Sequence, residues 1–152
     1  RAYLKQLGFE RYEVSNFAKK GFESRHNLNY WKRGEYIGFG VDASSFMGGR
    51  RFTNTRDLDE YIKCILSNYY PVVADEKIGE EDARFETVML SLRTAKGLDL
   101  AEYHARFGSD FYKDFAAPLK KNAAYLDCTD TSVRIKDAYL YVQNTIIIDF
   151  LS

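Results

Sequence analysis

The segment from Ser24 to Trp31 gathers the side chains that are best suited to bind a ligand. It contains one of the two histidines and the only tryptophan of the chain. The imidazole of His26 can ligate a metal or haem iron, or transfer protons near neutral pH. Tyr30 and Trp31 have flat apolar faces with a polar edge, against which a macrocycle or a base can stack. A histidine satisfied by backbone hydrogen bonds and a tryptophan in a core are the structural alternatives, and residue types alone leave both open.

Polar neighbours extend this candidate site. Asn27 can orient an imidazole or contact a ligand. Four arginines lie close in sequence, namely Arg25, Arg33, Arg50 and Arg51. Arginine pairs bidentately with carboxylates, and porphyrins carry propionates, although arginines on a surface are the commoner case. The other histidine, His104, falls within a helical pattern, and we interpret it as a surface or partly packed residue.

A glycine-rich segment, residues 34–49, follows the candidate site. Residues 35–41 alternate apolar side chains with glycine, which is typical of a strand that backbone or ligand approaches closely. Residues 43–47 continue this strand, the pair Gly48-Gly49 predicts a hairpin turn, and residues 50–54 form the returning strand. The Gly-x-Gly here is no dinucleotide fingerprint, because the third glycine and the following amphipathic helix are missing.

The remaining elements must position these residues. Gly8 closes a first helix, residues 9–16 have a short strand pattern, and residues 26–31 are expected to be irregular or one helical turn. Asp57 begins a helix with one apolar face, which Pro71 ends. This apolar face comprises Leu58, Tyr61, Ile62, Ile65, Leu66 and Tyr69.

The C-terminal half reads as helices around a hairpin. Helices are predicted over residues 80–93, from Asp99 to Gly108, and from Ser109 or Asp110 to Leu119. A hairpin joins residues 126–128 to 133–135, and a closing helix is capped by Asn144 or Thr145. This order is typical of a winged-helix arrangement.

Composition excludes several classes of function. The chain has 22 basic and 22 acidic residues, so net charge draws it neither to nucleic acid nor to an anionic membrane. No apolar run approaches the roughly 18 residues of a membrane span. The two cysteines have no metal-type spacing, which indicates free thiols in a cytosolic protein. No Ser-His-Asp arrangement or phosphate loop is present. The first residues read like the tail of a helix, and we expect the chain to be a fragment.

Several motifs together resemble a known family. They are Tyr12–Ala18, His26-Asn-x-x-Tyr-Trp31, Tyr36–Gly40 with Ala43–Ser45, Arg51-x-x-Asn54, Glu86–Arg93, Gly97-Leu98 and Asn144–Leu151. The chain is similar to the C-terminal part of the radical SAM proteins related to oxygen-independent coproporphyrinogen III oxidase. The His-Asn-x-x-Tyr-Trp motif points to the HemW-type branch, regarded as haem chaperones. The resemblance departs at the hairpin, where family glycines are replaced by Ala124-Tyr125-Leu126 and by Ile135–Tyr139.

The resemblance implies a mixed α/β fold in three parts. Residues 1–56 would be the C-terminal edge of a partial (β/α) barrel, and residues 57–77 a connecting helix and linker. Residues 78–152 would form a helical, winged-helix-like domain. Barrel strands without their neighbours expose their edges, so we expect self-association of the fragment or local disorder in its first half.

The resemblance also implies a function in porphyrin and haem metabolism, as a cytoplasmic haem chaperone. The full-length family carries a [4Fe–4S] cluster and S-adenosylmethionine. The cluster motif of three cysteines is absent here, so this chain should be inactive alone. Partners would be haem or porphyrinogen and a haem-acceptor protein, with no nucleic acid. Oxidative decarboxylation of coproporphyrinogen III and a non-enzymatic partner-docking module are the alternatives.

Two sets of site residues follow from the resemblance. The haem or substrate set has His26 as the iron ligand or haem contact, with Arg25, Asn27, Tyr30 and Trp31 beside it. The set that lines the cofactor side of the barrel comprises Gly38, Gly40, Ala43 and Ser44.

Overall fold

The computed structural model describes residues 2–151, in which helices and strands are mixed as expected. The chain divides into two compact units. The first unit joins the segment up to Arg33 with the segment from Arg84 onward, and the second unit is residues 34–83. Over the described residues, every helix is too short or too polar to cross a membrane. The division into residues 1–56, 57–77 and 78–152 refers to a longer family architecture and stays a prediction.

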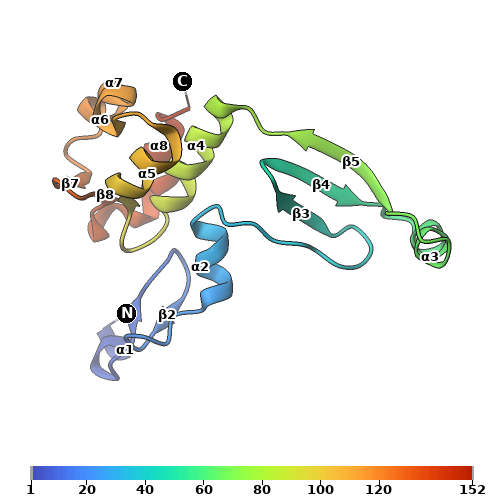
Figure 1. Cartoon of the computed structure of the whole chain (residues 1–152). Helices are drawn as coiled ribbons and strands as arrows, with labels where there is room; N and C mark the ends of the chain where they lie inside the picture. The colour runs from blue at the N-terminus through green and yellow to red at the C-terminus, as the bar shows by residue number, and fades with distance from the viewer. Residues whose placement is uncertain (1, 152) are drawn as a thin grey trace. The chain divides into compact units, whose positions relative to one another are not determined.

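The N-terminal part of the first unit is built from short elements (Figure 1). Helix α1 (Ala2–Gln6) ends at Gly8, whose φ of 78° suits glycine. Strands β1 (Glu10–Arg11) and β2 (Phe17–Ala18) pair antiparallel. The strand predicted over residues 9–16 is therefore shorter than expected, because the chain turns back at once.

Helix α2 (Arg25–Trp31) corrects the prediction of an irregular segment or a single turn. It has seven residues, close to two turns. The sequence encodes its start, because the Oγ of Ser24 accepts a hydrogen bond of 3.3 Å from the backbone N–H of Asn27.

The C-terminal part of the first unit has the predicted helices and hairpin. The helices are α4 (Glu80–Ser91), α5 (Leu100–Phe107), α6 (Phe111–Asp114), α7 (Ala116–Lys121), the 3-10 helix η1 (Asp137–Val142) and α8 (Gln143–Ile148). Strands β7 (Leu126–Cys128) and β8 (Ser132–Ile135) form the hairpin, and β6 (Leu98–Asp99) pairs with β8 as a third strand.

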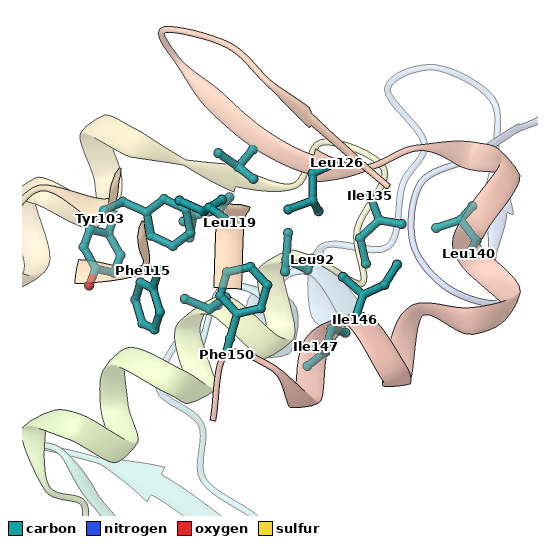
Figure 2. Close-up of a cluster of buried hydrophobic side chains, with 14 residues drawn as sticks. Leu92, Tyr103, Phe115, Leu119, Leu126, Ile135, Leu140, Ile146, Ile147 and Phe150 are labelled. Carbon is teal, nitrogen blue, oxygen red and sulfur yellow. The ribbon is translucent and has the colours of Figure 1, made fainter. Parts of the chain in front are cut away.

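One hydrophobic core lies among these helices and the small sheet. Figure 2 shows side chains from α4, α7, α8 and both hairpin strands converging around Leu92. Leu92, Val88 and Val133 are fully buried, and Phe150 is 1% exposed. The core thereby fixes α4 firmly within the unit, since interiors pack at the density of organic crystals.

Two helix ends differ from the prediction. The helix expected from Asp110 to Leu119 breaks at Phe115, whose φ of −120° is not helical. Pro118 then lies in the first turn of α7, where its missing N–H leaves no hydrogen bond unmade. Helix α8 follows directly from η1 and has no side-chain cap, so the cap predicted at Asn144 or Thr145 is wrong.

The second unit is a three-stranded antiparallel sheet with one helix. Strands β3 (Ser44–Met47), β4 (Arg50–Asn54) and β5 (Val72–Lys77) lie side by side in this order. Helix α3 (Leu58–Leu66) lies where β4 ends and β5 begins (Figure 1). The Gly48-Gly49 turn is confirmed, with both residues at positive φ.

Three expectations for the second unit are wrong. Strand β5 occupies residues 72–77, for which the sequence predicts no strand. Helix α3 ends at Leu66, well before Pro71. Residues 35–41 are not a strand: Tyr36 alone bridges to Phe46, since Gly40 with φ 106° and Asp42 with φ 58° turn the backbone away from an extended path.

Candidate functional site

Helix α2 presents two different faces, and the predicted haem-side residues divide between them. His26 and Tyr30, four positions apart, lie on an exposed face. Asn27 and Trp31 lie on a half-buried face. The sequence grouped these four residues in one site, whereas the helix directs them in two directions.

The exposed face carries an aromatic pair. The rings of His26 and Tyr30 meet edge to face, with centroids 4.8 Å apart and planes at 87°. Such pairs contribute about 1 kcal/mol and favour this orientation of the imidazole. Within residues 2–151, the imidazole nitrogens make no hydrogen bond, so both are available to a ligand. Arg25 is also exposed and has no ion pair with a described residue.

The half-buried face of α2 attaches the helix to the rest of the first unit. The Nδ2 of Asn27 donates a hydrogen bond of 3.4 Å to the hydroxyl of Tyr12. Leu28 and Trp31 line a cavity of about 620 Å³, whose walls also come from the β1–β2 hairpin, α4, α5 and the C-terminal sheet. This volume lies within the range of small-molecule sites.

The cavity walls carry charges of both signs. Its acidic and basic lining residues are Glu10, Glu23, Asp99 and Glu102, with Arg11, Lys20, Lys32, Lys96 and Arg106. The pKa of Glu23 lies below its ordinary value, mainly through hydrogen bonds from backbone N–H groups and further through the charge of Lys96. The balance of charge gives the cavity no clear preference for an anion or a cation.

The C-terminal end of α2 is held by an ion pair that sequence reasoning missed. The Nε of Arg33 donates to Oε2 of Glu86 on α4 at 2.7 Å, and the two side chains are only 11% and 16% exposed. On the neighbouring helix α5, Arg106 donates from Nη2 to the carbonyl of Lys32 at 3.2 Å and from Nη1 to Oγ1 of Thr87 at 3.3 Å. In the sequence, the only indication that Glu86 has a role was its place within a family motif.

The predicted cofactor-side residues have structural partners in the second unit. A Cβ on Gly38 would lie 2.3 Å from the carbonyl oxygen of Ser44, so the predicted close approach at this glycine is confirmed and is made by backbone. The N–H of Gly40 donates to the hydroxyl of Tyr61 at 3.2 Å. The backbone carbonyl of Ala43 accepts from the N–H of Asn54, and the hydroxyl of Ser44 lies 3.2 Å from that of Thr53. Their role in lining a cofactor site stays a prediction.

The metal-binding capacity of this chain is limited to single residues. Among the described residues, no group of three histidine, cysteine or acidic side chains lies close enough together to hold an ion. Cys64 and Cys128 are both free thiols. Two cysteines cannot supply the three thiolates of the cluster motif, so the residues present do not fit a [4Fe–4S] cluster.

Comparison with known proteins gives consistent relatives. The model of the HemN C-terminal domain matches residues 78–137. The protein named heme chaperone HemW from Bacillus subtilis is 34% identical over 113 residues, which cover 74% of this chain and 30% of that relative. Its namesake from Mycobacterium tuberculosis H37Rv is 36% identical over 104 residues, covering 68% and 27%. A structure of the Escherichia coli coproporphyrinogen III oxidase HemN, described as a radical SAM enzyme, superposes with a TM-score of 0.72 over 98% of this chain and 38% of that one, at 20% identity. The chain thus spans about 30% of the length of the first of these curated relatives.

Proposed function

We propose that this chain, which belongs to the HemW-type branch of the coproporphyrinogen III oxidase-like radical SAM proteins, contributes the haem-side helix of a haem chaperone. The observation that carries the proposal is the exposed His26 on α2, with its ring oriented by Tyr30. The relatives that are named heme chaperones support the assignment of haem as cargo.

The residues of the exposed face suit a haem ligand. An imidazole with unengaged ring nitrogens is the commonest protein ligand of haem iron. Tyr30 restricts the ring of His26, so less rotational freedom is lost when iron binds. Arg25 is adjacent in sequence and can pair with a propionate carboxylate. A carrier must release its cargo, and an exposed ligand favours transfer to an acceptor protein over deep retention.

Haem titration of the chain with His26→Ala tests this proposal. We expect the variant to lose the Soret shift of the ligated haem and to bind at least about tenfold more weakly, a loss of roughly 1.4 kcal/mol. His104→Ala is the matched control, because His104 is the second histidine of the chain and is likewise exposed, on α5. Equal spectra for His26→Ala and the unaltered chain would remove His26 from the ligand role.

Arg25→Gln separates ligation from propionate pairing. It should weaken haem binding by a smaller factor than His26→Ala and leave the Soret position unchanged, since the iron keeps its ligand. The affinity for haem with esterified propionates should not change with Arg25→Gln. An equal loss with the esterified haem would contradict the pairing.

Two further statements concern the whole protein. The [4Fe–4S] cluster and S-adenosylmethionine of the family would be held outside these 152 residues, because this chain has two cysteines. We expect the protein to act in the cytoplasm, where the free thiols Cys64 and Cys128 stay reduced.

A further inference from the structure

We propose that Glu86 and Arg33 are positioning residues, which set the orientation in which α2 presents His26 and Tyr30. This inference rests on the function proposed above. It adds that the C-terminal helices control the haem-side face chiefly through one ion pair, although neither Glu86 nor Arg33 lies on that face.

The ion pair joins the end of α2 to α4, a helix that packs into the hydrophobic core. Glu86 is on α4, two and six positions before Val88 and Leu92, which are fully buried in the core. Its partner Arg33 follows Lys32, the C-cap of α2. Because α4 is packed in the core, its contact with the end of α2 holds α2 in a fixed position relative to the core.

The backbone of Arg33 indicates that this contact is specific. Arg33 has φ 53°, in the left-handed region that follows many helices and is usually occupied by glycine. A residue with a side chain is less stable there than in the right-handed region. Its N–H closes the helix by donating to the carbonyl of Tyr30 at 2.9 Å. The glycine of this segment, Gly34, comes one residue after the left-handed position. That position is occupied by Arg33, whose charge reaches Glu86 from there.

Arg106 reinforces the same helix end from α5. It donates to the terminal carbonyl of Lys32 and to Thr87, next to Glu86 in sequence. Cations stabilise helix C-termini because the carbonyls there carry partial negative charge. Burial lowers the pKa of Arg106 and the nearby charge of Arg33 lowers it further, with Glu102 opposing. Arginine stays charged at neutral pH even when its pKa is lowered. Arg106 and Arg33 are therefore two neighbouring cations that depend on nearby acids. Glu86 is the acid that binds Arg33.

A second ion pair, between Lys32 and Glu102, contributes less to holding the end of α2. Lys32 and Glu102 are 2.9 Å apart, but their side chains are 62% and 59% exposed. Exposed pairs contribute little, because water screens them. The part-buried pair between Arg33 and Glu86 is therefore the one whose loss should release α2.

The test combines a local probe with haem binding, using Glu86→Gln in the whole chain. Trp31 is the only tryptophan of the chain and lies on α2, so its fluorescence reports directly on this helix. We expect Glu86→Gln to increase quenching of Trp31 by acrylamide, to weaken haem binding by about tenfold and to alter the Soret band. Glu86→Asp, which keeps the charge, should restore part of each signal.

Asp114→Asn is the matched control, because Asp114 also pairs with an arginine, Arg84, in the first unit and, within residues 2–151, forms no hydrogen bond or ion pair with α2. It should lower stability while leaving Trp31 quenching and haem affinity within about twofold of the unaltered chain. If Glu86→Gln and Asp114→Asn change Trp31 quenching equally, the positioning role is overturned. If His26→Ala binds haem normally, the proposed function fails, and the comparison of Trp31 quenching still decides the role of Glu86.

Discussion

The hydroxyl of Tyr103 donates a hydrogen bond of 2.7 Å to Oδ2 of Asp114, although Tyr103 is only 1% exposed. The same carboxylate oxygen accepts from the hydroxyl of Ser109 at 2.6 Å and from Nη1 of Arg84 at 2.5 Å. One oxygen thus joins α4, α5 and α6 beside the hydrophobic core. Among the described residues, no buried side-chain polar atom of this cluster lacks a hydrogen-bond partner, which is the condition under which a buried network stabilises a fold.

Tyr103→Phe should lower the free energy of unfolding by about 1–2 kcal/mol, because a hydrogen bond to a charged group is lost while the ring still packs. Urea denaturation followed by circular dichroism measures this change. Tyr112→Phe is the control, since the hydroxyl of Tyr112 donates to the carbonyl of Thr129 at a site that is 38% exposed. A loss with Tyr112→Phe as large as that with Tyr103→Phe would contradict the role of the cluster.

Acid should weaken this cluster. Burial raises the pKa of Asp114, but hydrogen bonds from Ser109 and Tyr103 and the charge of Arg84 outweigh it and hold the pKa below the ordinary value. A depressed pKa contributes stability that is present above the unfolded pKa of about 4 and is lost as the pH falls through the folded pKa. The stability of the chain should therefore decline below about pH 4. Asp114→Asn should be less stable at neutral pH and show a shallower decline; an unchanged slope would assign the acid sensitivity to other carboxylates.

Residues close together in the sequence were sufficient to predict most helices and turns. Asp57 and Asp99 cap α3 and α5 with hydrogen bonds of 2.8 and 2.9 Å, as their types and positions predict. The Gly48-Gly49 hairpin and helix α4 follow from turn chemistry and from helical spacing in the same way. These features depend on residues within a few positions of one another.

Long-range partners could not be predicted from one sequence. Strand β5 has exposed side chains throughout and no alternation, so only its pairing with β4 makes it a strand. Arg33 and Glu86 are 53 positions apart, and no spacing rule links them. The direction in which each site residue on α2 points could not be predicted either. An irregular segment has no defined faces, so the faces are known only once the segment is seen to be a helix.

Gly97 and Gly108 both have positive φ but differ in their surroundings, which gives a matched prediction. A Cβ on Gly97 would lie 2.2 Å from the carbonyl oxygen of Val133 and 2.5 Å from the Cβ of Arg134, whereas a Cβ on Gly108 meets nothing within 4 Å. Gly97→Ala should cost about 3 kcal/mol or more, from strained φ and from displacement of β8. Gly108→Ala should cost only about 1 kcal/mol, from φ alone. Thermal unfolding of both variants compares them, and equal losses would show that the packing of Gly97 against β8 is unimportant.

The second unit should drive self-association of this chain. Several apolar side chains on and after α3 are exposed, namely Leu58, Ile62, Ile65, Leu66, Tyr69 and Tyr70. Strand β5 is an edge strand with Val73 61% exposed, and such edges pair readily with other chains. Apolar patches of this kind are rare on monomeric proteins. We therefore expect the sedimentation coefficient of the chain to rise with concentration.

Leu66→Glu combined with Val73→Lys should suppress this association, because each substitution places a charge on the exposed apolar surface or on the strand edge. Phe22→Lys is the control, since Phe22 is 81% exposed in the first unit and lies outside the patch. Sedimentation velocity at several concentrations distinguishes the three proteins. A sedimentation coefficient that does not depend on concentration for the unaltered chain would contradict the prediction, as would equal suppression by Phe22→Lys, which would assign the association to general hydrophobicity and not to the edge of β5.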